Sequence, residues 1–278
     1  MGEGPLVSVI VPTKNNEGTI GQCLESIRGQ TYSDIEVIVV DNYSTDGTSK
    51  IAENFGFKLL LKGPERNPQR NYGAQHASGE YLMFIDSDME LEPNVVADCV
   101  AKLQHEGTQA VTIPEVSFGE GFWTRCKALE RSFYNDEETM ALARFFEKSV
   151  FDAVHGFDER LVGFDDRDLH FRIVNNGGKV SRSAAIIRHN EGRARIARLM
   201  RKKYLYGKTL HQYLSAHPDG RNTQWLLLRV TFVKHWGKLI RHPVLALGMA
   251  LMQACELSAA AAGYLAGRIK PLRGSDND

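Results

Sequence analysis

The chain has 278 residues, of which 42% are hydrophobic and 24% are charged. Its 34 basic residues balance 34 acidic ones. Because the net charge is zero, we do not expect the protein to bind nucleic acid broadly. Four widely spaced cysteines form no C-x-x-C pair, which argues against a zinc site or a disulfide framework. A chain of this length can bury one sizeable core and still carry a modest additional element.

Apolar runs and helical patterns alternate through the first half of the chain. This alternation predicts an α/β domain with a mainly parallel sheet. The predicted strands are Leu6–Val11, Glu36–Val40, Phe57–Leu61, Tyr81–Ile85 and Ala110–Ile113. The predicted helices are Thr19–Gln30, Ser49–Asn54, Gln69–Ser78 and Val95–Glu106. Functional side chains of such sheets gather at the carboxyl ends of the strands, so we expect the residues there to line one crevice: Pro12-Thr13, Asp41 and Asp86-Ser87-Asp88.

Asp86 and Asp88 flank one small residue directly after a predicted buried strand. Alone, this pattern is more often a solvated acidic turn. At a strand end beside Asp41, two carboxylates favour a hard divalent cation such as Mg²⁺ or Mn²⁺, with positions left open for phosphate oxygens. Asp41 itself can accept hydrogen bonds from a nucleobase or ribose, and the turn and helix cap that follow it are compatible with that role.

Three acids, Asp165, Asp166 and Asp168, precede the predicted helix Leu169–Asn176. Helix capping alone would explain them, because the helix dipole favours acids there. Adjacent carboxylates also repel, however, and the raised pKa that results suits a general base near neutral pH. His189 ends a short apolar strand. Such a histidine is more often structural, but it can also supply a nitrogen ligand to the same metal.

Several enzyme classes are excluded by motifs that the sequence lacks. No G-x-G-x-x-G follows the first predicted strand, no G-x-x-x-x-G-K-[ST] occurs, and no G-x-S-x-G is present. These absences argue against a dinucleotide oxidoreductase, a P-loop NTPase and an enzyme with a nucleophile elbow.

Five segments together resemble the family 2 glycosyltransferases, which have the GT-A fold. The matching segments, in the family's order, are Val7–Glu17, Val39–Thr48, Arg70–Gly73, Gly79–Asp88, and Gly156–Glu159 with Asp165–Leu169. The resemblance implies an inverting enzyme that uses a nucleotide sugar. It also implies a GT-A catalytic domain over residues 1–191. Residues 192–278 lie outside the matched segments, and their own composition predicts C-terminal amphipathic and apolar helices.

The resemblance implies a role for each matched position. Asp166 matches the family's catalytic base and Asp165 its acidic neighbour. Asp86 and Asp88 match the D-x-D pair, in which Asp88 is the expected direct metal ligand and Asp86 is expected to turn toward the ribose. The positions implied to border the nucleotide sugar are Pro12, Thr13, Asn15, Glu17, Asp41, Arg70, Asp86 and Ser87, and the metal candidates are Asp88, Asp86 and His189.

Four positions depart from the family pattern without removing a catalytic group. Lys14 stands where tyrosine is frequent, Asn42 where an acid is common, Asp165 where glutamate is usual, and His155 where a second glycine is common. The first two leave the nucleotide open, with a UDP-sugar as first expectation and a GDP-sugar as second.

The C-terminal region changes in character from about Gly192. A basic stretch over Arg193–Lys208 precedes a predicted amphipathic helix, Gln224–Arg241, with Lys234, His235, Lys238 and Arg241 on one side. Pro243–Gly267 is apolar and long enough to span a bilayer, but Gln253 and Glu256 favour a monotopic or helix-packed role. These segments either pack on the catalytic domain or contact a membrane surface.

Without a recognisable secretory signal, the expected location is the cytoplasm, at the cytoplasmic face of the membrane. The expected acceptor is a hydroxyl or phosphate, either on a saccharide or on a polyprenyl- or lipid-linked molecule. The alternatives are a soluble transferase whose C-terminal helices form a dimer interface, and a catalytically silent nucleotide-sugar-binding protein. A sugar nucleotidyltransferase is disfavoured, because its glycine-rich N-terminal loop is missing.

Overall fold

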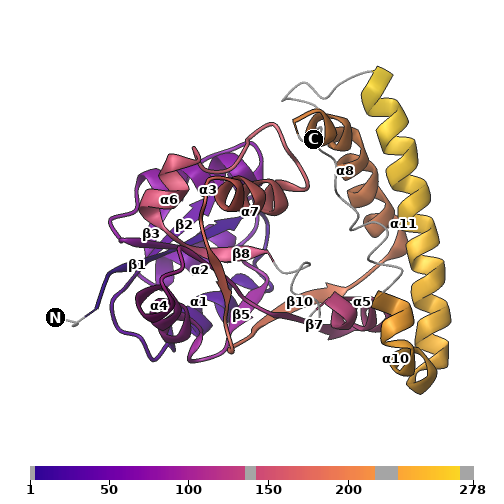
Figure 1. Ribbon diagram of the computed structural model, residues 1–278, viewed down its shortest axis with the longest axis horizontal. Coiled ribbons are helices and arrows are strands. Elements are labelled where there is room, and N and C mark those ends of the chain that lie inside the picture. Colours follow the sequence, from indigo (N-terminus) through magenta and orange to yellow (C-terminus); the bar gives the residue numbers. More distant parts are fainter. Residues whose placement is uncertain (1–3, 135–141, 217–230, 270–278) are drawn as a thin grey trace. The chain divides into compact units, whose positions relative to one another are not determined.

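The computed structural model describes residues 4–134, 142–216 and 231–269. The chain divides into two compact units (Figure 1). The first comprises Met1–Glu115, Leu142–Glu159 and Asp165–Asn190, and the second comprises Val116–Ala141, Arg160–Phe164 and Glu191–Asp278. The sequence-based boundary after residue 191 assigns Val116–Ala141 and Arg160–Phe164 to the catalytic domain, whereas both belong to the second unit.

A seven-stranded, mostly parallel sheet forms the centre of the first unit, as the sequence predicted. Its strands are β1 (Val7–Thr13), β2 (Ile35–Asp41), β3 (Lys58–Leu61), β4 (Tyr81–Phe84), β6 (Ala110–Thr112), β8 (Ala143–Glu147) and β9 (Val180–Arg182). The spatial order is β3-β2-β1-β4-β8-β6-β9. The first four strands in this order are mutually parallel, whereas β8 runs antiparallel to both β4 and β6. This fold is the GT-A-like α/β architecture.

Helices cover both faces of this sheet, because its strands are apolar on both sides. Along β1, Val7, Val9 and Val11 enter one core, and Ile10 enters the other. The first core includes residues of α1, α2 and α4, and the second includes residues of α3, α6 and α7. The bounds of these helices are α1 (Ile20–Arg28), α2 (Thr48–Asn54), α3 (Arg66–Gln75), α4 (Val95–Glu106), α6 (Lys148–Ala153) and α7 (Asp165–Asn175). A strand buried on both faces reads as a continuous apolar run, which is why the sequence pattern was informative here.

A second, three-stranded sheet has the order β5-β10-β7, formed by β5 (Met89–Leu91), β10 (Ile187–Arg193) and β7 (Glu115–Glu120). β10 runs antiparallel to β5, with His189 opposite Met89. This register brings a histidine from late in the chain beside the acidic turn that precedes β5.

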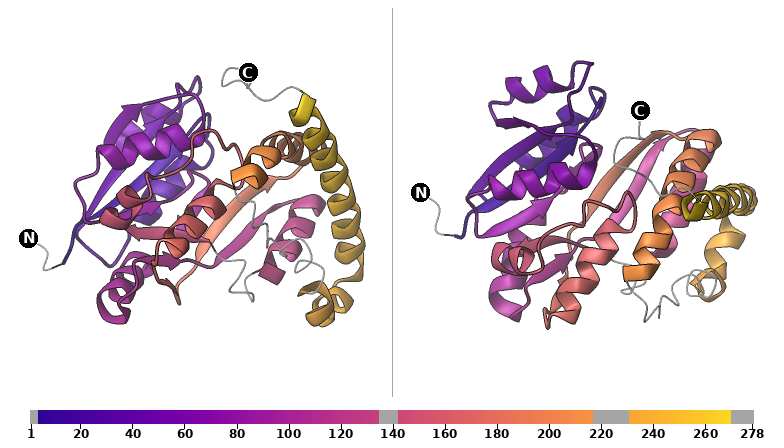
Figure 2. Two further views of the ribbon diagram at one scale, coloured as in Figure 1. Left: turned by 45° about the horizontal axis from the view of Figure 1, so that its top comes forward. Right: turned by 90° about the horizontal axis from the view of Figure 1, so that it is seen from above.

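The second unit is built mainly from helices α5 (Phe122–Tyr134), α8 (Ile196–Ala216), α10 (Trp236–Arg241) and α11 (Pro243–Ile269). α11, drawn in yellow, runs along α8 and also contacts α5 (Figures 1 and 2). Glycines permit the close approach of α8 and α11. A Cβ atom on Gly263 would collide with the backbone of Tyr204, and one on Gly207 would collide with that of Ala260.

The C-terminal predictions had mixed outcomes. Residues 224–230 of the predicted helix Gln224–Arg241 lie outside the described residues, and the described remainder is interrupted at His235, after which α10 begins. Pro243–Gly267 is one helix, α11, and its length and hydropathy would suffice to cross a membrane. The helix predicted at Leu169 begins four residues earlier, at Asp165, so all three acids lie in its first turn.

Candidate active site

The loops that follow β1 and β2 are fastened to each other by side chains predicted to border a nucleotide. The Asn15 carboxamide oxygen accepts a hydrogen bond from the Thr45 amide at 2.8 Å. A Glu17 carboxylate oxygen likewise accepts from the Gly47 amide at 2.8 Å. Asn15 and Glu17 therefore shape this part of the crevice, and Thr13 lies beside Asp41 at the ends of the paired strands.

Asp41 is fully buried, and its carboxylate closes the turn after β2. It accepts hydrogen bonds from the amide of Ser44 at 3.1 Å and from the hydroxyl of Ser49 at 2.5 Å. A cavity of about 530 Å³ adjoins it, lined by Asp41, Tyr43, Ser44, Ser49, Glu53, Leu59 and Leu61. The expected turn after the strand is therefore present, but the N-cap of α2 is Gly47, which makes no side-chain capping hydrogen bond, and not the expected Ser44 or Asp46. The contact of Asp41 with a base or ribose stays a prediction.

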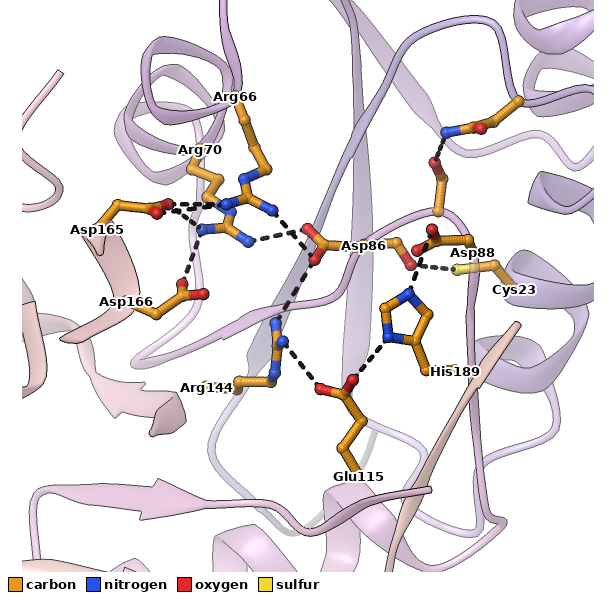
Figure 3. A network of polar contacts seen from close by, with 12 residues as sticks. Cys23, Arg66, Arg70, Asp86, Asp88, Glu115, Arg144, Asp165, Asp166 and His189 are labelled. Carbon is orange, nitrogen blue, oxygen red and sulfur yellow. Dashed lines mark hydrogen bonds and ion pairs between the residues drawn. The ribbon is translucent and has the colours of Figure 1, made fainter. Parts of the chain in front are cut away.

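Arg70 lies at the centre of a cluster of ion pairs (Figure 3). Its guanidinium is fully buried and lies 2.8 Å from Asp86, 3.1 Å from Asp165 and 2.8 Å from Asp166. The guanidinium also lies over the ring of Phe157, 4.9 Å from its centroid. Arg70 was predicted to approach the diphosphate or donor sugar. In the structure its two terminal nitrogens are engaged by carboxylates, so its direct effect is to orient those three acids.

The two acids at the start of α7, Asp165 and Asp166, have different surroundings and opposite pKa shifts. The Asp165 side chain is 4% exposed and pairs with both Arg66 and Arg70, whereas the Asp166 side chain is 21% exposed. Burial raises the pKa of Asp165, with repulsion from Asp166 adding to the effect. Burial also acts to raise the pKa of Asp166, but Arg70 and Arg144 outweigh it and hold that pKa below its ordinary value. The raised pKa expected for the pair is therefore found at Asp165.

Asp168, the third acid of this turn, has a structural role. Its carboxylate pairs with Arg172 one helical turn later, with Nη2 at 2.6 Å. The same guanidinium donates to the backbone carbonyl oxygens of Val154 and Gly156. The segment that includes His155 and Gly156 is left-handed, with φ of 61° and 64°, a backbone conformation that glycine adopts at less cost than histidine does.

A chain of contacts continues from Asp86 to the second acid of the D-x-D pair. Arg144 lies 3.8 Å from Asp86 and 3.2 Å from Glu115, and Glu115 lies 2.6 Å from His189 Nδ1. His189 Nε2 in turn lies 3.3 Å from Asp88. Thus Asp86 faces the arginines, while Asp88 and His189 face each other (Figure 3).

Asp88 and His189 have the donor atoms that a divalent metal would need. Burial lowers the pKa of His189, but hydrogen bonds to Asp88 and Glu115 outweigh it and raise that pKa to about 10. Both ring nitrogens are therefore protonated at neutral pH in the absence of a metal, and a metal bound at Nε2 would have to displace its proton. Engagement of Nδ1 by Glu115 leaves Nε2 directed at Asp88, an arrangement in which a carboxylate orients a metal-binding imidazole. Within residues 4–134, 142–216 and 231–269, no three His, Cys, Asp or Glu side chains form a group that could hold a metal. A metal here would therefore have two protein ligands and would complete its shell with phosphate or water oxygens.

The structure brings most of the predicted residues to one edge of the sheet and adds three that were missed. Ser87 accepts a hydrogen bond from Asn16, and Pro12 lies in β1 opposite Val40. Arg66, Glu115 and Arg144 were not predicted. Arg66 lies one helical turn before Arg70, a spacing that the sequence shows. Glu115 and Arg144 lie on β7 and β8, strands of two different sheets, and no local pattern in the sequence indicates that these two side chains meet.

Three comparisons show what the chain is similar to. It is 40% identical over 98 residues to the putative glycosyltransferase EpsH of Bacillus subtilis, a match that covers 33% of this chain and 28% of EpsH. It is 28% identical over 193 residues to a PGL/p-HBAD biosynthesis glycosyltransferase of Mycobacterium bovis, covering 66% of this chain and 75% of that protein. Its fold matches the mannosyltransferase PcManGT of Pyrobaculum calidifontis, solved with GDP-Man and Mn²⁺, with a TM-score of 0.58, 22% identity, and 97% and 77% of the two chains covered.

The GT-A-like fold, with a polar site at the carboxyl ends of its parallel strands, places the chain among α/β proteins that bind ligands at this edge. The family model for glycosyl transferase family 2 matches residues 8–157, more than half of the chain. The protein belongs to glycosyl transferase family 2.

Proposed function

We propose that the protein is an inverting, divalent-metal-dependent glycosyltransferase that transfers a sugar from a nucleoside diphosphate sugar to a hydroxyl or phosphate acceptor. One observation carries the proposal. A single network of ion pairs and hydrogen bonds joins the candidate metal pair, Asp88 and His189, to a partly exposed carboxylate, Asp166, through Glu115, Arg144, Asp86 and Arg70.

In the proposed reaction, Asp166 accepts the proton of the acceptor hydroxyl. The acceptor oxygen bonds to the anomeric carbon as the bond from that carbon to the phosphate oxygen breaks, and the bonding electrons leave with the nucleoside diphosphate. The low pKa of Asp166 keeps it ionised at neutral pH and so ready to accept the proton. A bound Mn²⁺ or Mg²⁺ would stabilise negative charge on the diphosphate.

The expected donor is a UDP-sugar first and a GDP-sugar second. The relative from Pyrobaculum calidifontis was solved with a GDP-sugar and Mn²⁺, which supports a nucleotide sugar with a divalent metal as the donor-side ligands. The cavity beside Asp41 offers a place for the nucleobase, with the exposed ring of Tyr43 at its wall. We propose a polyprenyl- or lipid-linked acceptor, on the basis of the apolar helix α11.

Calorimetric titration of the purified chain with UDP and GDP tests the donor site. With Mn²⁺ present, one nucleotide is expected to bind, and EDTA is expected to weaken that binding at least about tenfold, because the metal would link the diphosphate to Asp88. Asp88→Ala should reproduce the loss with the metal present. If neither nucleotide binds to the folded chain, or if EDTA changes nothing, the metal-dependent donor site is refuted.

Glu115→Gln is expected to weaken Mn²⁺ binding about 10- to 100-fold, because the imidazole of His189 would lose the carboxylate that orients it. The measurement is the signal of free Mn²⁺ in electron paramagnetic resonance during a titration without nucleotide. The control is Glu120→Gln, at the exposed end of the same strand, which should bind Mn²⁺ as the unchanged chain does. Equal Mn²⁺ affinity in both variants would contradict the role of Glu115.

A further inference from the structure

α11 has two faces that differ in composition. Its large exposed side chains, with exposed fractions between 49% and 87%, are Val244, Leu247, Leu251, Leu257, Leu265 and Ile269. At 3.6 residues per turn, Val244, Leu247, Leu251, Leu265 and Ile269 fall within about 60° of one another around the helix axis, so they form one stripe, and Leu257 lies to one side of it. Glu256 is the only charged residue between Pro243 and Gly267, and it is buried. The stripe therefore carries no charge over about 37 Å, at 1.5 Å per residue.

An uncharged stripe of this length needs a partner. Isolated exposed leucines are normal, but a long contiguous apolar surface marks a site that binds protein or membrane. The opposite face of α11 is already occupied, since Met249 and Met252 pack in a core with Cys126 and Phe133 of α5.

The inner face of α11 is held by charges, which decides against a helix that inserts across a bilayer. Glu256 lies 3.4 Å from Lys127 and 3.7 Å from Lys203. Lys127 also pairs with Glu130 at 2.7 Å. Withdrawing α11 from the second unit would expose these charges, and inserting it together with α8 would carry exposed cations of α8 into hydrocarbon, which is strongly unfavourable. Those cations include Arg198, Arg201 and Lys202.

The segment before α11 supplies the features of a helix that lies at a membrane interface. Val233, Trp236 and Ile240 have exposed fractions between 62% and 74%. Lys234 and Arg241 are exposed in the same segment, and Arg268 is exposed at the far end of α11. Apolar and aromatic side chains flanked by cations are complementary to an interface with anionic headgroups, where tryptophan is favoured.

From these observations we propose that the outer stripe of α11, with Trp236 and Ile240, lies in the plane of an anionic bilayer surface as a monotopic anchor. The leucines enter the boundary between headgroups and acyl chains, and the flanking cations contact lipid phosphates. The cytoplasmic leaflet presents such a surface. This inference concerns the second unit alone and does not depend on the proposed transfer reaction.

Co-sedimentation of the full chain with vesicles tests the proposal. Binding is expected to be at least about tenfold tighter to an equal mixture of phosphatidylcholine and phosphatidylglycerol than to phosphatidylcholine alone, and to weaken with salt. Leu247→Asn combined with Leu251→Asn should reduce binding to both vesicles at least about tenfold, because apolar contact is lost. Lys234→Gln combined with Arg241→Gln should reduce binding to the anionic vesicles selectively.

Val174→Asn is the matched control, because Val174 is an exposed apolar residue on a helix of the first unit. This variant should bind vesicles as the unchanged chain does. The alternative is that a second copy of the chain covers this stripe of α11. Sedimentation equilibrium without lipid tests that alternative by measuring self-association. The proposal is overturned if the chain does not bind vesicles, or if the variant with both leucines replaced binds as tightly as the unchanged chain. It is also overturned if the chain self-associates without binding vesicles and that variant abolishes the self-association. Resistance to alkaline carbonate extraction, as expected of a spanning helix, would overturn it as well.

Discussion

Asp166→Asn is expected to slow sugar transfer about a hundred- to ten-thousandfold while leaving Mn²⁺-dependent nucleotide binding nearly unchanged. The carboxamide has the same shape but cannot accept the acceptor's proton. It still offers an oxygen to Arg70, which lies 2.8 Å from Asp166 in the structure, so the ion-pair cluster should keep its geometry. The measurements are initial rates with saturating donor, together with calorimetry of the nucleoside diphosphate.

Two further variants make this result specific. Asp152→Asn changes an exposed carboxylate, with a side chain 57% exposed, and should leave the rate unchanged. Asp165→Asn changes the buried partner of Arg66 and Arg70. It should reduce the free energy of unfolding by more than it raises the activation free energy of sugar transfer. Normal transfer by Asp166→Asn would refute the base assignment. A rate loss at Asp165 with unchanged stability would move the role of base to that residue.

Arg70→Ala is expected to lower the free energy of unfolding by about 3–5 kcal/mol, because it leaves buried carboxylates without their shared cation. Arg70 is fully buried and contacts Asp86, Asp165 and Asp166 at once. Arg70→Lys should lose less, because an ammonium keeps the charge but cannot bridge the acids as the planar guanidinium does. Urea unfolding followed by circular dichroism measures both variants.

The loss at Arg70 should depend on pH with a definite sign. Against the opposing effect of burial, Arg70 holds the pKa of Asp166 below its ordinary value. Ionised Asp166 therefore favours the native state above about pH 4, and this contribution is lost as the pH falls through the lowered native pKa. The loss in free energy of unfolding caused by Arg70→Ala should be largest near neutral pH and should become smaller in acid.

Arg66→Ala is the matched comparison, because Arg66 contacts two of the same carboxylates from the same helix but its side chain is 34% exposed. Solvent screens its charge, so a loss of about 1 kcal/mol or less is expected. Equal losses for Arg66→Ala and Arg70→Ala, or a deficit for Arg70→Ala that grows in acid, would contradict the central role given to Arg70.

The sequence could predict most of the first unit because its signals are local. β1 and β2 are continuous apolar runs, and each ends near a polar residue that the sheet then brings to one edge. Their parallel pairing places Thr13 opposite Asp41, as strand–helix alternation implied. The same reasoning identified α11, because its length and hydropathy lie within one contiguous segment.

The sequence could not assign the partners of these polar residues. Arg144 reaches Asp86 from β8, a strand that the sequence reading did not predict, and Glu115 reaches His189 from a strand 74 residues earlier in the chain. The adjacency of Asp165 and Asp166 predicted a raised pKa in the pair but not which acid would have it. Burial and repulsion from Asp166 raise the pKa of Asp165, whereas neighbouring arginines outweigh burial and lower the pKa of Asp166.

By itself, the sequence determined the fold class, the acids at the strand ends and the apolar character of α11, because each is expressed in neighbouring residues through the periods of strand and helix. Only the tertiary structure decided that Asp86 faces arginines, that Asp88 faces His189, and that the charge of α11 is turned inward onto Lys127 and Lys203. The physical reason is that these contacts depend on strand order and helix packing, which bring together residues far apart in the chain.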